Sequence, residues 1–310
     1  YVENKLKSVK FGKGLKTIGY NAFYRNRKLT NIEFTGENLT SIGTYAFEYC
    51  YSLTELNLKG NGETVIGYCA FCGNDALKKI SLAGIKTIND GAFQNCGDLN
   101  SVNFGEGLLS IGSYAFRNCP NIETVSLPES LTTINDEAFE ECSKLTSIDI
   151  PNKVTKLNDN TFANCTSLKN VSIGSGCTSI SLTAFLGSNA IEKIIVAGGN
   201  ANYSSVDGAL LNKEKTSIIL YPKSKSGEFV IPDTVTSISD HAFDNAPNLT
   251  KITIGKNVKT IGASAFQNCN SLETVIFKDS DTTKKTIGDY AFYNCPALSK
   301  VDFGNAVKSI

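Results

Sequence analysis

The stretch Ala115–Ile134 reads A-F-R-N-C-P-N-I-E-T-V-S-L-P-E-S-L-T-T-I, and variants of it recur along almost the whole chain. Its phenylalanine belongs to a series whose neighbours are 22 to 26 residues apart, apart from one interval of 58 residues. A leucine-type frame of this period is typical of a stacked solenoid. The series comprises Phe23, Phe47, Phe71, Phe93, Phe116, Phe139, Phe162, Phe185, Phe243, Phe266 and Phe292.

The residues around each phenylalanine predict two strands per repeat. Ile or Leu stands five residues before it, and large apolar residues stand six, nine and eleven residues after it. The alternation in the resulting L-x-x-V-x-L is what a strand with one buried face requires. The T-x-I segment before the next phenylalanine predicts a second short strand. Between the strands, runs such as residues 136–141 predict a single helical or 3₁₀ turn.

One such repeat cannot bury its own apolar face, so the copies must stack into a continuous core. The sequence therefore predicts an α/β fold: a right-handed solenoid, shaped as a rod or horseshoe, that is rich in strands and has short helical turns. At roughly 4.8 Å per rung, about thirteen rungs would extend for about 60 Å. We expect one solenoid domain over residues 1–310, with a repeat block at 1–196, a hairpin-containing insertion at 197–229 and a second block at 230–310.

The full pattern A-F-x-N-C-x-x-L-x-x-V-x-L-P-x-x-L-T-x-I resembles the BspA-type leucine-rich repeat of bacterial and protozoan surface proteins, and the resemblance covers essentially residues 5–310. It implies a leucine-rich-repeat solenoid that lies outside the cell and functions in adhesion or in binding a host protein. The chain begins directly in a repeat and ends at Ile310, in the Ile position of another. We therefore expect a segment of a longer array, with the secretion signal and anchor outside it.

Charge and hydropathy exclude two classes of partner. Lys and Arg total 30, as do Asp and Glu, so no net charge attracts nucleic acid or an anionic membrane. No apolar run approaches the length of a transmembrane helix, so we expect no membrane insertion within this segment.

Ten cysteines raise the possibility of a disulfide framework or a metal site. Seven of them stand three residues after one of the recurring phenylalanines, where other copies have Asn, Ser or Ala. This exchange indicates a position that needs a small residue, and predicts buried free thiols. Cys69 and Cys72 form a C-x-x-C, but they straddle Phe71 with no second such pair, so a redox or zinc site is not expected. An oxidised pair stays open. Asparagine, frequent in the preceding position, predicts amides stacked from rung to rung.

Catalytic chemistry finds little support in the sequence. His241 is the only histidine and occupies a variable position, which nearly excludes Ser-His-Asp, Cys-His and His-metal arrangements. The adjacent carboxylates Glu140 and Glu141 lie on a predicted turn and indicate solvated charge. We predict that the chain is not an enzyme and has no catalytic residue, cofactor or metal.

Two predicted surfaces lie on the strands and at the long interval. The residues that follow the β-branched residue of each L-x-x-V-x-L should point outward, and this outward row is polar, which suits either a broad protein contact or a merely soluble face.

Segments 206–211 and 217–222 predict a β-hairpin around residues 212–216, and insertions in repeat arrays often mark a binding side. A structural splice between repeat blocks is the alternative. Ile195 interrupts the polar row and is predicted to pack under the hairpin. The candidate binding residues here are Asn103, Ser126, Asp149, Ile195, Asn212, Lys213, Glu214 and Lys215.

A third predicted surface consists of tyrosines in the first repeats, on the turns that flank the phenylalanines. Tyrosine is a favoured contact residue because it combines a large area with a polar tip. Packing against neighbouring rungs is the alternative role. Half of the twelve tyrosines belong to this cluster: Tyr20, Tyr24, Tyr45, Tyr49, Tyr51 and Tyr68.

These features predict a non-enzymatic, extracellular repeat scaffold that binds an extracellular or host-surface protein. The alternative is a passive spacer array that associates with itself.

Overall fold

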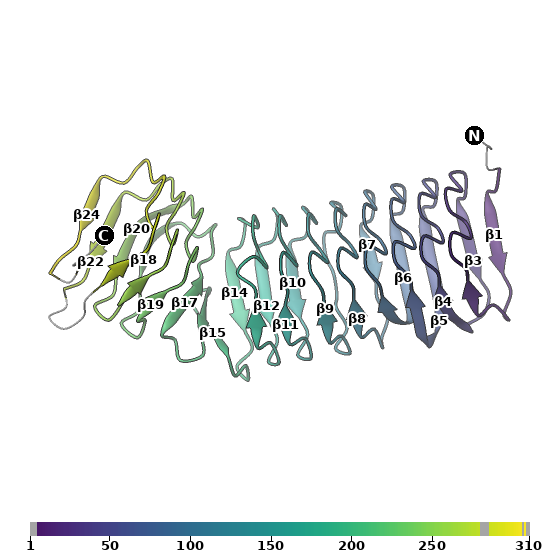
Figure 1. The fold of residues 1–310 in the computed structure, drawn as a ribbon, viewed down its shortest axis with the longest axis horizontal. Coiled ribbons are helices and arrows are strands. Elements are labelled where there is room, and N and C mark those ends of the chain that lie inside the picture. Colours follow the sequence, from purple (N-terminus) through teal and green to yellow (C-terminus); the bar gives the residue numbers. More distant parts are fainter. Residues whose placement is uncertain (1–4, 280–284, 306, 308–310) are drawn as a thin grey trace. The chain divides into compact units, whose positions relative to one another are not determined.

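The computed structural model describes residues 5–279, 285–305 and 307, and every regular element in those residues is a β-strand (Figure 1). The chain forms two compact units, one of residues 1–168 and 176–188 and one of residues 169–175 and 189–310. The predicted strand-rich leucine-rich-repeat solenoid of about 13 turns is confirmed. The predicted division at residues 196 and 229 stays a prediction.

In the first unit, the strands pair in parallel, and most repeats contribute strand residues from two segments. The L-x-x-V-x-L segments form β1 (Ser8–Phe11), β3 (Asn31–Phe34), β7 (Ser101–Asn103) and β10 (Ser147–Ile150). The T-x-I segments form β2 (Thr17–Ile18), β4 (Leu39–Ile42), β8 (Ser110–Ile111), β9 (Thr133–Ile134), β11 (Lys156–Leu157) and β13 (Ser179–Ile180). Two longer strands run through both segments of their repeats, β5 (Glu55–Ile66) and β6 (Lys79–Ile88).

The sheets pair repeat to repeat in register, and the phenylalanines stack between them. In β3, buried Ile32 and Phe34 alternate with exposed Asn31 and Glu33, as one buried face requires. Neighbouring phenylalanine rings from Phe23 to Phe185 have centroids 4.9 to 5.9 Å apart and planes within 12° of parallel. This phenylalanine ladder forms the core of the unit.

The side chain three residues after the phenylalanine also donates a hydrogen bond in several repeats, a role that the sequence did not indicate. The Cys142 thiol donates a hydrogen bond to the backbone carbonyl oxygen of Phe116, one repeat earlier, at 3.3 Å. Asn74 and Ser188 make the equivalent bonds to the carbonyls of Phe47 and Phe162, at 3.0 and 2.7 Å. Cys, Asn and Ser at this position are thus small and can donate, whereas Ala246 in the same position is small without a side-chain donor. All ten cysteines are free, and nine are buried.

We expect Cys142→Ala to lower the free energy of unfolding by about 1–2 kcal/mol, because it leaves the buried Phe116 carbonyl without this donor. Cys142→Ser should cost less than about 1 kcal/mol, since a hydroxyl restores the bond. Urea titration of both variants followed by circular dichroism measures the difference. Equal losses for Ala and Ser would contradict a hydrogen-bonding role.

The predicted α/β class and its helical turns are wrong. The residues two before and two after Phe139, Glu137 and Glu141, have φ angles of 57° and 63°. Left-handed residues at this spacing prevent a helix. The N–H groups of Glu137, Phe139 and Glu141 also donate to carbonyls of the next repeat, at 2.9 Å each, so the turn is hydrogen-bonded along the stack.

The same backbone geometry explains the recurrent asparagine two residues after the phenylalanine. Asn95 and Asn118 have φ angles of 59° and 54°, a region that asparagine tolerates better than most residues. The predicted stacking of amides is confirmed between them, because Asn118 Nδ2 donates to Asn95 Oδ1 at 2.9 Å.

The second unit contains a parallel pair, β12 (Asn170–Ile173) with β14 (Lys193–Val196), and two further sheets. One sheet has the order β15-β16-β17-β19-β21-β23 and the other the order β18-β20-β22-β24. Their bounds are β15 (Tyr203–Val206), β16 (Ala209–Asn212), β17 (Ser217–Leu220), β18 (Gly227–Val230), β19 (Ser237–Ile238), β20 (Leu249–Ile254), β21 (Thr260–Ile261), β22 (Thr274–Phe277), β23 (Thr286–Ile287) and β24 (Lys300–Asp302).

The predicted hairpin is confirmed, since β16 and β17 are antiparallel around residues 213–216. The prediction of one continuous strand over residues 206–211 is wrong. Asp207 and Gly208, with φ angles of 51° and 81°, form a two-residue turn between the antiparallel strands β15 and β16. Asp-Gly is a strong two-residue hairpin signal. The insertion is therefore a three-stranded meander, and β17 then pairs in parallel with β19.

A tyrosine replaces phenylalanine inside the 58-residue interval. The ring of buried Tyr221 stacks on Phe243 with centroids 4.7 Å apart. Its N–H donates to the carbonyl of Ala242 at 2.8 Å, as most ladder phenylalanines, Phe243 among them, do to the following repeat. The core ladder of the second unit therefore begins at Tyr221 and continues through Phe243 and Phe266 to Phe292.

Candidate functional site

The tyrosines of the first repeats lie on the turns beside the phenylalanine ladder, as predicted, and form two rows. Tyr45 packs edge-on against Tyr20 and Tyr68, with centroids 6.0 and 5.4 Å apart. Tyr49 contacts Tyr24 at 6.1 Å, in the second row, and Tyr51 at 5.7 Å. Rung stacking therefore does hold these rings in place.

Stacking leaves much of the aromatic area in contact with solvent. The relative exposure is 67% for Tyr20, 46% for Tyr68 and 38% for Tyr51, whereas Tyr45 and Tyr49 are half-buried. Both roles considered for the cluster, packing between rungs and an accessible aromatic face, are therefore compatible with the geometry.

Two arginines complete this surface, and sequence reasoning missed them. The Arg25 guanidinium carbon lies 5.0 Å from the Tyr24 ring centroid and 5.5 Å from that of Tyr49. Arg27 lies 5.6 Å from the Tyr51 ring. Such cation–π contacts hold an arginine side chain over the ring face. Residues 20–27 contain two tyrosines and two arginines, so this grouping was available in the sequence. We call these six tyrosines with Arg25 and Arg27 the tyrosine–arginine surface.

A buried carboxylate lies beneath the surface. Glu48 is 8% exposed, and burial raises the pKa of its carboxyl, against the opposing effect of the nearby Arg25 charge. The negative charge of Glu48 is in turn the main reason that the pKa of Tyr49 is raised. Gly73 provides the space for the Tyr49 ring, since a Cβ there would lie 2.5 Å from the ring atoms. The local geometry is thus fixed by packing and by charge together.

The candidate residues at the hairpin have structural roles for the most part. Asn212 Oδ1 accepts hydrogen bonds from the N–H groups of Thr216 and Ser217, at 2.8 Å each, and closes the loop. Lys213 Nζ donates to the carbonyl of Asn200 at 2.6 Å. Glu214 and Lys215 are exposed at the tip. These geometries favour the splice interpretation for Asn212 and Lys213 and leave the tip as a small accessible feature.

The outward row is solvent-exposed, as the alternation predicted. Asn103 and Ser126 line a shallow depression of about 270 Å³ beside Gly105, while Asp149 lies outside it. Asn103 Oδ1 accepts a hydrogen bond from the Gly105 N–H at 3.1 Å, which shapes the turn at its edge. Small polar side chains over so shallow a depression offer few anchoring contacts.

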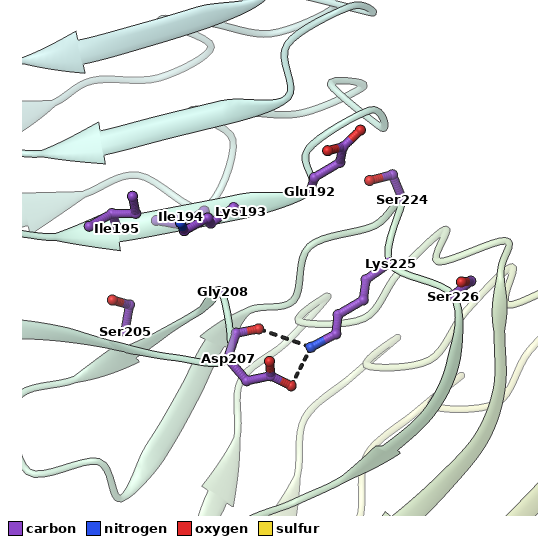
Figure 2. Close-up of a pocket in the computed structure, with 10 residues that line it drawn as sticks. All are labelled: Glu192, Lys193, Ile194, Ile195, Ser205, Asp207, Gly208, Ser224, Lys225 and Ser226. Atoms are coloured by element: carbon purple, nitrogen blue, oxygen red, sulfur yellow. Dashed lines mark hydrogen bonds and ion pairs between the residues drawn. The ribbon is translucent and has the colours of Figure 1, made fainter.

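Ile195 does not pack under the hairpin as predicted, because it is 42% exposed. It lines a cavity of about 720 Å³ within the second unit, shown in Figure 2. Residues of β14 line one side, and the turn residue Asp207 and the segment before β18 line the others. Figure 2 shows Lys225 reaching from that segment to Asp207, where Nζ donates to the carbonyl oxygen at 3.1 Å and forms an ion pair with the carboxylate.

Glu140 differs from its predicted state of solvated charge. It is 9% exposed, because the position after the phenylalanine faces Arg117 in the equivalent position of the preceding repeat. Arg117 contacts Glu140 at 3.0 Å and Glu137 at 2.9 Å. Burial is the largest cause that raises the pKa of Glu140 to about 7, followed by a hydrogen bond with Glu137 and opposed by Arg117.

This raised pKa predicts a pH-dependent stability. Between the ordinary carboxyl value of 4.5 and about 7, the folded protein binds more protons at Glu140 than the unfolded chain. The free energy of unfolding therefore falls as pH rises through this window. We expect Glu140→Gln to be neutral at pH 4 and to stabilise by about 1 kcal/mol at pH 8, after allowance for solvent screening. Urea denaturation at the two pH values measures this, and an equal effect at both would contradict it.

The described residues offer little for catalysis or metal binding. They contain no group of three or more His, Cys, Asp or Glu side chains placed to hold a metal ion. His241 is exposed and lies 3.3 Å from Asp244. Within the C-x-x-C, a hydrogen bond from Cys72 lowers the pKa of the Cys69 thiol, but both side chains are buried and both thiols are free. No helix in the described part of the chain is suited to crossing a bilayer.

Comparison with known proteins identifies related repeats. A family model described as the BspA type leucine rich repeat region matches six copies, over residues 1–97, 86–205 and 220–310. A crystal structure of a leucine-rich repeat protein from Bacteroides ovatus is 24% identical, with a TM-score of 0.70, and the match covers 99% of this chain and 84% of that one. None of the curated proteins compared with the chain matches it.

A second similar structure is that of a leucine rich cell surface protein from Faecalibacterium prausnitzii. It is also 24% identical, with a TM-score of 0.60, over 97% of this chain and 88% of the other. At this level of identity, both structures support the fold alone.

Proposed function

Because the chain belongs to the BspA-type leucine-rich-repeat family, we propose that it is a non-enzymatic scaffold that binds another protein outside the cell. The name of the similar Faecalibacterium prausnitzii protein supports a location at the cell surface. The partner that this location favours is an extracellular-matrix or host-surface protein, so that binding results in adhesion.

The observation that carries this proposal is the tyrosine–arginine surface. Tyrosine and arginine are the residues most enriched at the energetic centres of protein interfaces. Here they are held by ring stacking and cation–π contacts on turns whose backbone is hydrogen-bonded to the next repeat, as Tyr45 N–H is to the Tyr68 carbonyl at 3.0 Å. A pre-ordered surface loses less side-chain entropy on binding.

Binding to a panel of purified extracellular-matrix and mucosal proteins tests the proposal, with the monomeric chain immobilised. We expect saturable binding to at least one protein, weakened at least tenfold by combining Tyr20→Ser, Tyr68→Ser and Arg25→Ala. These side chains are exposed, so the fold should persist. Tyr290→Ser is the matched control, because Tyr290 is an equally exposed tyrosine, at 70%, in the second unit.

One result would contradict the proposed site, and another the proposed function. Saturable binding that the triple variant leaves unchanged would exclude the tyrosine–arginine surface as the site, and a variant at Glu214 would then test the hairpin tip. No saturable binding, together with concentration-dependent oligomers of the chain alone, would support a passive, self-associating array instead.

A further inference from the structure

The sheet built from the L-x-x-V-x-L segments is interrupted in the second unit. Such strands normally pair with their equivalents one repeat away, as β12 does with β14 and β18 with β20. After β14, however, the chain forms the β15–β17 meander, which joins the other sheet. The next strand of this type is β18, which is an edge strand, and β14 does not pair with it. β18 therefore has one unpaired edge.

The two edges of the interruption differ in their hydrogen bonding. On β14, the Ile194 N–H donates to the carbonyl of Gly208 at 3.0 Å, and the Val196 N–H donates to Ser205 Oγ at 3.3 Å. The Asp207–Gly208 turn and its flanking residues thus satisfy the donors of β14 from within the chain.

On β18, two backbone N–H groups have no hydrogen-bond acceptor among the described residues. Gly227 and Ile231 direct their N–H groups to β20, onto the carbonyls of Asn248 and Thr253, at 3.0 Å each. By the alternation of a parallel ladder, Glu228 and Val230 direct theirs away from β20. Neither N–H has an acceptor among the residues that the structure describes. An edge of this kind is a template for another strand.

The side chains on both sides of the interruption also change character. In the first unit, the outward row consists of polar residues, namely Lys10, Glu33, Asn57, Ser81, Asn103, Ser126 and Asp149. At the two strands that border the interruption, the row has Ile195 and Val230, which are 42% and 53% exposed. Exposed β-branched residues on both sides would contact a β-branched or aromatic side chain placed between them.

The 720 Å³ cavity lies at this place, lined by Ile195 on β14 and by Ser224, Lys225 and Ser226 directly before β18. We propose that the edge of β18 binds an extended segment of a partner protein as an added strand. Carbonyl groups of that segment accept from the N–H groups of Glu228 and Val230, and an apolar side chain of the segment contacts Val230 and Ile195. Main-chain bonds provide the affinity in this mode, and alternate side chains provide the selectivity.

The inference rests on the proposed protein-binding function and adds a second contact site to it. As a probe we would use the synthetic peptide N-L-T-K-I-T-I-G, the sequence of residues 248–255, because β18 already pairs with that strand on its other edge. Amide hydrogen exchange of the protein, followed by NMR, reports on each N–H separately. We expect saturating peptide to slow exchange at Glu228 and Val230 at least tenfold, with the amides of β3 in the first unit unchanged.

Two variants separate the hydrogen bonds from the apolar contact. Val230→Pro removes an N–H that points away from β20, so the β18–β20 pairing can persist, and it should weaken peptide binding at least tenfold. Val230→Thr keeps the N–H and the shape and should weaken binding about threefold through the lost apolar contact. If Val230→Pro perturbs the fold, the combination of Val230→Thr and Ile195→Thr provides the test, with a larger loss expected than for Val230→Thr alone.

Unslowed exchange at Glu228 and Val230 with peptide in millimolar excess would overturn the inference, as would undiminished peptide binding by every variant. Binding to the panel of host proteins distinguishes a failure of this inference from a failure of the proposed function. Panel binding that Val230→Pro leaves intact would retain the function and exclude the edge. Protection by peptide without any panel binding would retain the edge and exclude the function.

Discussion

Replacement of Phe116 by Ala is expected to lower the free energy of unfolding of the surrounding repeats by about 3–5 kcal/mol, the usual cost of removing a fully buried phenylalanine. Phe116 is completely buried, and its ring stacks on Phe93 and Phe139, each at 5.3 Å, and meets Phe104 edge-on at 5.5 Å. Two sheets converge on this ring, so little can collapse into the space that it leaves.

Native-state hydrogen exchange measures this effect repeat by repeat. Because each repeat contacts only its neighbours, the loss should be concentrated in the repeats of Phe93, Phe116 and Phe139. Phe23→Ala is the control, since Phe23 is half-buried, and we expect a clearly smaller cost there. A loss below about 1 kcal/mol for Phe116→Ala would contradict the central place of the ladder in stability.

Replacement of Lys285 by Met should destabilise the second unit by about 3 kcal/mol, through loss of charge-assisted hydrogen bonds. Lys285 is 1% exposed, and its Nζ donates to the carbonyls of Gly255, Lys256 and Val258, at 3.0, 3.0 and 2.8 Å. Methionine fills a similar length but cannot donate, so three carbonyls of one turn lose their partner.

Lys256→Met is the matched control, because Lys256 belongs to the same turn and its side chain is exposed. We expect that change to alter stability by less than about 0.5 kcal/mol. Chemical denaturation of both variants measures the difference. Equal stability of the Lys285 and Lys256 variants would show that the buried ammonium is not what holds the turn.

The fold was predictable from sequence wherever an apolar side chain determined it. The spacing of the phenylalanines and of the L-x-x-V-x-L positions requires two buried strand faces per repeat, and both are present in most repeats. The helical turns were mispredicted because a short run such as residues 136–141 looks the same in composition whether its hydrogen bonds are local or run along the stack. Only the φ angles of Glu137 and Glu141 distinguish the two.

Polar side chains were harder to predict, because their state depends on the neighbouring repeat. Glu140 is buried since Arg117 stands in the equivalent position one repeat earlier, and aligning the repeats would have paired them. Lys285 gave no such signal, since the three carbonyls that it contacts belong to a turn about 30 residues away. The Asp207–Gly208 turn was available in the sequence as a dipeptide and was overlooked within a longer apolar run.

The candidate site was only partly predictable. The tyrosines were predictable because half of the twelve lie in the first repeats. The place of Arg25 was not, because it depends on contacts of its guanidinium with two rings from different repeats. Val230 was missed because its significance depends on the unpaired edge of β18, which is a property of the topology. Both proposed contact sites lie on features that depart from the regular repeat.

The most direct test of the proposed function is hydrogen exchange of this chain, with and without the extracellular protein that it binds most tightly. We expect slowed exchange in residues 20–27 and 45–51, on the turns that carry the tyrosine–arginine surface, with the ladder amides of Phe116 and Phe139 unchanged. Protection confined to other turns of the first unit, or no protection in any segment at saturating partner, would contradict it.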